Sequence, residues 1–183
     1  MRSRTLRFCI FLLSPVLAFA LVAPTATALE LAVGDAAPDF ALVGSDGRTH
    51  RLAEHRGQRG VVLAWFPAAF TSGCTAELQD MRDHAGAIAG YDAAVYLASV
   101  DTPEKNAAFA KEHGAQQVVL SDPSSETAQA YGVVGPGGLY ASRWTFYIDA
   151  DGKIAHIDKS VSTTTAGQDI ARKLGDLGFP TRP

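Results

Sequence analysis

The sequence predicts an α/β fold, with a central mixed β-sheet flanked by helices, in one domain that follows an N-terminal leader. Short apolar runs of strand length alternate along the chain with segments whose apolar residues recur at helical spacing. The chain has 183 residues, about the length of one domain. Its hydrophobic content of 47% is ordinary for a globular protein and supplies enough apolar side chains for a core.

The leader has the layout of a secretory signal peptide, so we expect a signal peptide over 1–28 and the folded domain over 29–183. Three arginines lie within the first seven residues, and the apolar run that follows over 8–22 is shorter than the roughly 20 residues of a bilayer span. Ala26-Thr27-Ala28 places small residues where a signal peptidase cleaves. We expect cleavage after Ala28 and a periplasmic or secreted protein. The alternative is an uncleaved N-terminal membrane anchor.

Cleavage would leave an acidic domain with a single thiol. The leader carries three arginines and no acidic residue, so the remaining chain is more acidic than the net charge of −3 of the whole sequence. A mildly acidic domain without a basic run is a poor candidate for binding nucleic acid or, after cleavage, a membrane. Cys9 would leave with the leader, and Cys74 alone could form no internal disulfide.

The first part of the domain predicts a β-hairpin followed by a buried strand. Residues 40–43 and 49–52 are short extended segments on either side of Asp46-Gly47, a strong hairpin turn. The continuous apolar run over 61–66 is typical of a central strand that is covered on both faces. Pro67 ends this strand.

The middle of the domain predicts a helix, a strand and a second helix. The first helix begins near Cys74, and its apolar residues recur at helical spacing as far as Ala89. Residues 94–100 are a second apolar strand. Thr102-Pro103 then provides an N-cap and a first helical residue for a helix that should stop at Gly114.

The last part predicts a third short strand over 118–120, a helix that opens at 121–123, and a second hairpin. The strands of that hairpin, 143–149 and 153–158, flank another Asp-Gly turn, and an amphipathic helix over 165–177 closes the chain. After the first hairpin the order is therefore β-α-β-α-β-α-β-β-α. A β-α-β unit followed by a β-β-α unit is the arrangement of a thioredoxin-like sandwich, here with an N-terminal β-hairpin.

Cys74 is the candidate reactive residue. It stands where a strand and a loop give way to a helix, so it should face unpaired backbone N–H groups and the positive end of the helix dipole. Both favour the thiolate, which is the nucleophilic form of cysteine. Thr71 can place a hydroxyl beside the sulfur, Gly73 lets the backbone approach closely, and Pro67 rigidifies the loop. The alternative is a buried structural thiol, which is a common role for a free cysteine.

Pro67, Thr71 and Cys74 form the pattern P-x-x-x-T-x-x-C, which resembles the active-site motif of the peroxiredoxins, a family of the alkyl hydroperoxide reductase/thiol-specific antioxidant type. The string over 71–77, followed by 81–83, is similar to the subgroup called peroxiredoxin Q or bacterioferritin comigratory protein. Further segments resemble the same subgroup, namely 33–40, 120–123, 130–133 and 143–154.

The resemblance implies a thiol peroxidase that reduces hydrogen peroxide and organic hydroperoxides. Cys74 would attack the peroxide and become a sulfenic acid. Arg143 would hold Cys74 as thiolate and polarise the peroxide, and Thr71 would hydrogen-bond both the peroxide and the sulfur. Pro67 would shield the sulfur from water. The alternative roles are a surface ion pair for Arg143 and an ordinary helix cap for Thr71.

Two charged residues on the Cys74 helix are not assigned to the site. Glu77 is better explained as an acid at the start of the helix, and Arg82 as a surface or interface ion-pair partner. Gln79 stands where many members of the subgroup carry a second, resolving cysteine. The resemblance therefore points to a one-cysteine variant that an external thiol, either a small thiol or a thioredoxin-like protein, must reduce.

We expect no cofactor and no metal site, because the five histidines form no ligand cluster. The protein could be a monomer or a homodimer. Two other functions compete with the peroxidase. An exported thioredoxin-like disulfide reductase would need a second active-site cysteine. A redox sensor or binding module would use oxidation of Cys74 without catalytic turnover.

Overall fold

The computed structural model describes residues 30–135 and 137–182. The expected signal peptide, with Cys9 and the cleavage site after Ala28, lies outside the described residues. The strands are β1 (Ala41–Gly44), β2 (Thr49–Arg51), β3 (Gly60–Trp65), β4 (Ala93–Ser99), β5 (Val118–Ser121), β6 (Thr145–Ile148) and β7 (Ile154–Asp158). The helices are α1 (Ser72–Asp83), α2 (Ala85–Ala89), α3 (Pro103–His113), α4 (Glu126–Ala130) and α5 (Ala166–Asp176), with one 3-10 turn, η1 (Leu52–Glu54).

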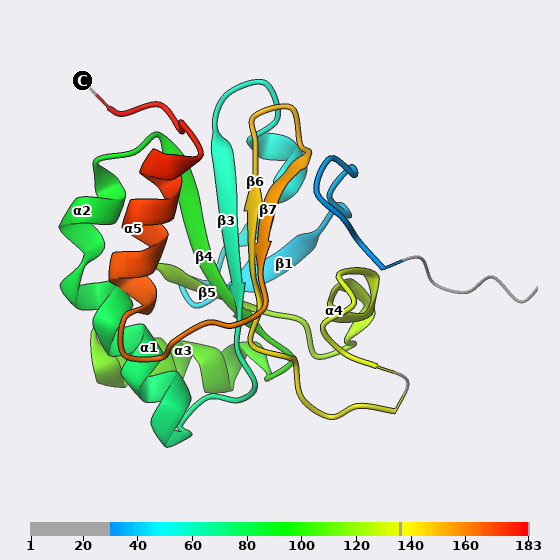
Figure 1. Ribbon diagram of the computed structural model, residues 1–183. Helices are drawn as coiled ribbons and strands as arrows, with labels where there is room; N and C mark the ends of the chain where they lie inside the picture. Colours follow the sequence, from blue (N-terminus) through cyan, green and yellow to red (C-terminus); the bar gives the residue numbers. More distant parts are fainter. Residues whose placement is uncertain (1–29, 136, 183) are drawn as a thin grey trace, which may run out of the picture.

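The strands form one mixed sheet in the order β2-β1-β5-β4-β3-β6-β7 (Figure 1). The three central strands β3, β4 and β5 are parallel. The β6–β7 hairpin is antiparallel to β3 at one side, and the β1–β2 hairpin is antiparallel to β5 at the other. The thioredoxin-like α/β sandwich with an N-terminal β-hairpin is therefore confirmed.

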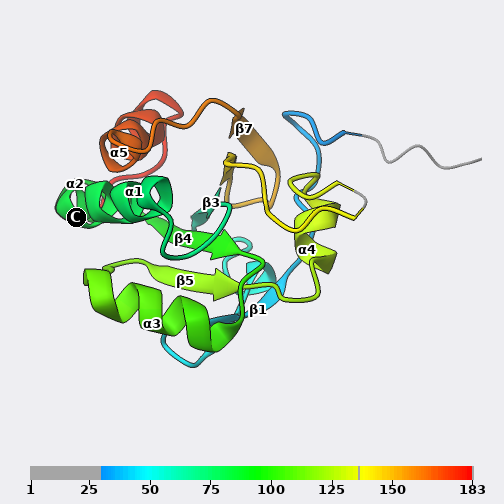
Figure 2. The same ribbon diagram turned by 90° about the horizontal axis from the view of Figure 1, so that it is seen from below.

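Two apolar cores lie on opposite faces of the sheet because side chains alternate along each central strand. Helices α1, α2, α3 and α5 cover one face, and α4 with η1 covers part of the other (Figures 1 and 2). Along β3, Val62 belongs to the first core, whereas Leu63 and Trp65 belong to the second. All six residues of β3 are buried, as the continuous apolar run predicts.

The helices follow the predicted starts and stops, with two differences. The helix predicted to open at 121–123 begins only at Glu126, because Ser121 is still part of β5. Thr102 accepts a hydrogen bond from the backbone N–H of Lys105, so it caps α3 as expected, and Gly114 ends that helix in the left-handed region. The helix predicted to run as far as Ala89 is instead two helices, α1 and α2. His84 separates them, with a backbone ψ of 10° that leaves the helical range.

Candidate active site

The loop between β3 and α1 places Cys74 at the carboxyl end of the central strand. Cys74 is the third residue of α1 and is 1% exposed. The loop reverses direction at Phe70, a non-glycine residue with a φ of 69°. Thr71 follows in extended geometry as the N-cap. Cys74 therefore lies in the first turn of α1, where the backbone N–H groups have no partner within the helix.

The same loop is held from the neighbouring strand by Asp101, a residue that the sequence analysis did not single out. Its carboxylate accepts hydrogen bonds from the backbone N–H of Ala69 at 2.7 Å and from Ser99 Oγ at 3.1 Å. Lys105 Nζ lies 2.5 Å from the other carboxylate oxygen. Asp101 lies two residues after the end of β4, which is next to β3 in the sheet, so an acid just beyond an adjacent parallel strand was the available signal.

Arg143 reaches Cys74 from the segment that precedes β6. Its Nη2 atom donates to Cys74 Sγ at 3.3 Å. The backbone N–H of Trp65, at the end of β3, donates to the carbonyl of Trp144 at 2.8 Å, which fixes the neighbouring Arg143 beside the active-site loop. Arg143 lies two residues before β6 rather than on the strand predicted over 143–149, and its side chain is 19% exposed.

Glu77 forms an ion pair with Arg143 through Oε2 and Nη1, and this corrects the interpretation of Glu77 as an acid at the start of the helix that lies outside the site. Glu77 is 1% exposed, and α1 carries no acidic residue in its first turn. The sequence signal was its spacing from Cys74, since residues three apart share one face of a helix. A carboxylate that shares a face with a buried cysteine must also point into the protein.

The electrostatics of the three groups are coupled. Burial raises the pKa of Glu77 to about 7, even though Arg143 favours the carboxylate form and acts in the opposite direction. Burial also lowers the pKa of Arg143, but the Glu77 carboxylate and the Cys74 sulfur more than offset this, so the pKa of Arg143 is above its ordinary value. Arg143 therefore stays charged at any pH near neutral, and Glu77 titrates in that range.

The remaining predicted site residues lie on the loop between β3 and α1 and at the start of α1. Thr71 Oγ1 donates to the carbonyl of Ala68 at 3.1 Å, and its side chain makes no capping hydrogen bond to α1, so the ordinary helix-cap role is not observed. Pro67 is half-buried, two residues after the end of β3. A Cβ at Gly73 would lie 3.5 Å from Arg143 Nη2, so the guanidinium packs against the backbone there.

Two further residues of α1 lie as the sequence analysis expected. Arg82 pairs with Asp83 at 2.8 Å and donates to the carbonyl of His113, away from the sulfur. Gln79 occupies the position of the resolving cysteine and is half-buried on the helix.

Over residues 30–135 and 137–182, no three metal-binding side chains gather into a group, and no helix there is long and apolar enough to cross a bilayer.

Comparison with known proteins adds an independent observation. The AhpC/TSA family matches residues 33–157 of this chain. A peroxiredoxin of Mycobacterium tuberculosis is 39% identical over 151 residues, which cover 79% of this chain and 96% of the relative. Peroxiredoxin Bcp of Escherichia coli is 35% identical over 140 residues, 73% of this chain and 89% of its own. The crystal structure of peroxidoxin BcpB from M. tuberculosis superposes with a TM-score of 0.70 at 32% identity, covering 79% of this chain and 96% of that one.

Proposed function

Because this chain belongs to the AhpC/TSA family and is a thiol peroxidase of the peroxiredoxin type, in the Q/Bcp subgroup, we propose that Cys74 is the residue that attacks the peroxide. The observation that carries the proposal is the hydrogen bond from Arg143 Nη2 to Cys74 Sγ at 3.3 Å, at the start of α1. A guanidinium beside the sulfur and unpaired N–H groups at the helix start both stabilise the thiolate.

The first step transfers one oxygen atom to sulfur. The Cys74 thiolate attacks the terminal oxygen of the hydroperoxide, an S–O bond forms, and the O–O bond breaks. The electron pair of that bond goes to the departing oxygen, which takes a proton and leaves as an alcohol, or as water when the substrate is hydrogen peroxide. The sulfur is oxidised to a sulfenic acid and the peroxide is reduced.

Arg143, Thr71 and Pro67 orient and shelter this reaction. Charge builds up on the departing oxygen, and Arg143 can stabilise it without reorganising because Glu77 fixes the guanidinium from the other side. Thr71 Oγ1 donates its hydrogen bond to the carbonyl of Ala68, so its lone pairs are available to accept a hydrogen bond from the peroxide O–H. Pro67 has no N–H group and limits the access of water at the edge of the site.

We further propose that the sulfenic acid is resolved by an external thiol. A first thiol forms a mixed disulfide with Cys74 and releases water. A second thiol then releases the Cys74 thiolate and leaves as the oxidised disulfide. Gln79 supplies no sulfur for an internal route. The substrates in this proposal are hydrogen peroxide and organic hydroperoxides, and the reductant is a small thiol or a thioredoxin-like protein.

The proposal extends to the location of the protein. The basic start, the apolar run and Ala26-Thr27-Ala28 support export to the periplasm or the medium, with residues 29–183 as the mature domain. Loss of Cys9 with the leader would leave Cys74 as the only sulfur able to form a disulfide.

The test is peroxide consumption with and without thiol donors. With a suitable donor, the wild-type protein should turn over many equivalents of peroxide, and Cys74→Ser should turn over none. Without a donor, the wild type should consume about one equivalent rapidly, and intact mass should then show sulfenic and later sulfinic acid on Cys74. Cys9→Ser is the matched control and should behave as the wild type.

Two outcomes would contradict this proposal. Sustained consumption by the wild type without any thiol would rule out the one-cysteine cycle. Stoichiometric oxidation that no donor reverses would favour the alternative of a sensor or binding module without turnover.

A further inference from the structure

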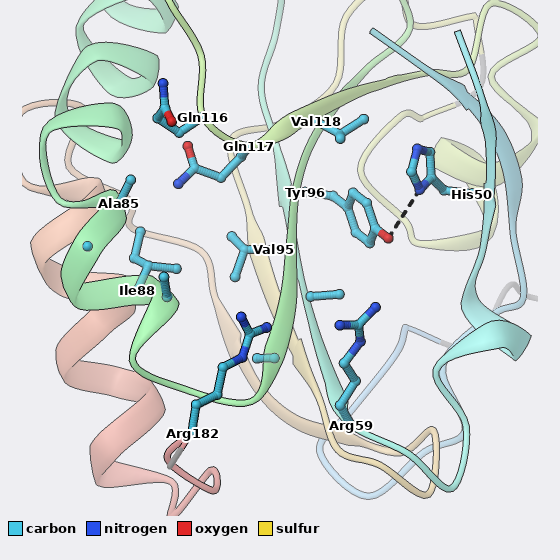
Figure 3. A pocket seen from close by; sticks show the side chains of 14 residues that line it. His50, Arg59, Ala85, Ile88, Val95, Tyr96, Gln116, Gln117, Val118 and Arg182 are labelled. Carbon is cyan, nitrogen blue, oxygen red and sulfur yellow. Dashed lines mark hydrogen bonds between the residues drawn. The ribbon is translucent and has the colours of Figure 1, made fainter. Parts of the chain in front are cut away.

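A groove of about 510 Å³ lies at the end of the sheet away from Cys74, where β4 and β5 begin (Figure 3). The C-terminal segment closes this end of the sheet, because the backbone N–H of Asp92 donates to the carbonyl of Pro180 at 2.7 Å. Cys74 follows the other end of β3 (Figure 1). The groove is therefore separate from the candidate active site, and its volume falls within the range of small-molecule sites.

The floor of the groove is apolar and incompletely covered. Val95 lies on β4, a central strand of the sheet, on the same face as Ile88, yet it is only half-buried. Ile88 of α2 forms an adjoining wall. Central parallel strands are normally buried on both faces, so an open stretch of β4 leaves apolar surface that a ligand could cover.

A chain of hydrogen bonds runs along one side of the groove and orients Arg59. Arg59 Nε donates to His55 Nδ1 at 3.1 Å, so the proton of the neutral His55 ring is on Nε2. His55 Nε2 then donates to Tyr96 Oη at 2.9 Å, and the Tyr96 hydroxyl donates to His50 Nδ1 at 3.3 Å. His50 Nε2 completes the chain by donating to the Asp46 carboxylate at 3.0 Å.

The neutral form of His55 is supported by its surroundings. Burial lowers the pKa of His55, and the neighbouring Arg59 charge lowers it further. His55 and Tyr96 are both nearly fully buried, so the two rings form a rigid support for the Arg59 side chain. Arg59 uses only Nε in this support, which leaves both terminal nitrogens for the groove.

Arg182 faces Arg59 across the start of β4, and both guanidinium groups point into the groove (Figure 3). Across the described ranges 30–135 and 137–182, no carboxylate lies within ion-pair distance of Arg59. The acid beside Arg182 is Asp92, and its Oδ1 is 3.8 Å from Arg182 Nε, too far for a direct hydrogen bond. Two arginine side chains therefore line one groove, and among the described residues Arg59 has no carboxylate partner and Arg182 has only a distant one.

We propose that this groove binds a small organic anion, with its acid group between Arg59 and Arg182 and its apolar part against Ile88 and Val95. A carboxylate or a phosphate would satisfy both guanidinium groups, because each can accept paired N–H donors. The apolar floor would favour a ligand with an aromatic or alkyl body over a bare inorganic anion.

The experiment uses four probes that separate the two parts of the proposal. Benzoate and phenyl phosphate carry an acid and a ring, benzyl alcohol carries the ring alone, and inorganic phosphate carries the charge alone. Each is titrated into the reduced wild-type protein, and backbone amide NMR shifts locate the site. At least one of the two aromatic anions should bind at least tenfold more tightly than benzyl alcohol and inorganic phosphate, with shifts around 86–95 and 116–118.

Variants then test the residues that carry the proposal. Arg59→Gln and Arg182→Gln should each lower the affinity for the tighter-binding aromatic anion at least fivefold. Arg172 is an exposed arginine on α5, and Arg172→Gln should leave that affinity unchanged. Tyr96→Phe keeps the ring but breaks the hydrogen-bond chain that orients Arg59. The affinity for the same anion should therefore fall about twofold to fivefold. A thermal melt confirms that each variant is folded.

The proposal is wrong if neither aromatic anion binds, if benzyl alcohol binds as well as both, or if both arginine variants keep wild-type affinity. Amide shifts confined to the Cys74 loop would place the anion in the candidate active site and would likewise refute the groove. None of these measurements involves peroxide, so their result is independent of the proposed peroxidase mechanism.

Discussion

The guanidinium of Arg143 lies between the sulfur of Cys74 and the carboxylate of Glu77, so each group affects the charge of the other two. Arg143 donates to the sulfur of Cys74 and, in the proposed reaction, stabilises the departing oxygen. Glu77 keeps Arg143 in place. Its burial costs free energy, because an ionised carboxylate loses its hydration inside the protein. At the residue scale, the site therefore combines a positive charge that the proposed reaction needs with a carboxylate whose ionised form is disfavoured by burial.

Replacing Arg143 should slow the first step most. Arg143→Ala should lower the second-order rate constant for peroxide by roughly 10²-fold, since one preorganised donor to a developing oxyanion contributes on that order. The rate constant of Arg143→Lys should lie between those of the wild type and Arg143→Ala, because an ammonium keeps the charge but cannot contact both Cys74 and Glu77 as a guanidinium does. Stopped-flow oxidation of Cys74 measures the rate. Arg172→Ala is the control, and an Arg143→Ala variant as fast as the wild type would refute the assignment.

Glu77 should give the protein a specific dependence of stability on pH. Its pKa is raised from 4.5 in the unfolded chain to about 7 in the folded protein, so the folded state binds the proton more tightly. This contribution is fully present below pH 4.5 and is lost as the pH rises through 7. Relative to Glu77→Gln, the wild type should lose up to about 3 kcal/mol of unfolding free energy over that interval.

Urea unfolding at pH 4.5 and pH 8 measures this difference for the wild type and Glu77→Gln. Glu112→Gln, which changes a carboxylate on a side chain that is 64% exposed, should follow the wild type at both pH values. A wild type and a Glu77→Gln variant that change in parallel with pH would contradict the raised pKa.

At the scale of elements, the position of Cys74 depends on how α1 packs against α5. Gly167 is the close contact between these helices, since a Cβ there would lie 2.6 Å from the carbonyl oxygen of Asp80 and 2.8 Å from Met81 Cα. The backbone N–H of Gly167 also donates to the Asp80 carboxylate at 2.7 Å. These contacts hold the helix that carries Cys74 and Glu77 against the sheet.

Gly167→Ala should therefore destabilise the fold by about 1–3 kcal/mol, because backbone atoms of α1 must move to admit the methyl group. Gly86→Ala is a matched control within α2, where a Cβ meets nothing within 4 Å. That control should be neutral or up to about 1 kcal/mol more stable, since alanine favours helix. Urea denaturation measures both, and equal stabilities for the two variants would argue against the tight helix contact.

At the scale of the whole molecule, the two ends of the sheet have different chemistry. The carboxyl end of β3 leads to Cys74 and Arg143, and the amino ends of β4 and β5 border the groove with Arg59 and Arg182. The parallel central strands cause this division, because the loops at their opposite ends cannot contact each other.

Export is the prediction that concerns the whole chain. In a host with a general secretory pathway, N-terminal sequencing of the extracytoplasmic protein should begin at Leu29. Ala26→Lys together with Ala28→Lys should block cleavage, because a signal peptidase requires small residues at these positions. A protein recovered only in the cytosol at full length would contradict the signal peptide, and a full-length membrane-bound form would support an uncleaved anchor.

The local sequence determined the order of the helices and strands and the place of the reactive cysteine. The apolar runs of β3 and β4, the Thr102-Pro103 start of α3 and the turn at Asp46-Gly47 each depend on neighbouring residues, so spacing and capping chemistry identified them. The loop from Pro67 to Cys74 was recognisable for the same reason, because its residues are contiguous.

Tertiary structure alone decided which distant residues meet. Glu77 was interpreted as an acid at the start of the helix because it lies near the predicted helix start, and only the approach of Arg143 from a segment 66 residues later makes it a buried ion-pair partner. Asp101 and the groove lined by Arg59 and Arg182 were missed for the same reason. Hydrogen bonds and ion pairs across the sheet join residues whose separation along the chain leaves no periodic signal, whereas helices, strands and turns are stabilised by residues close in sequence.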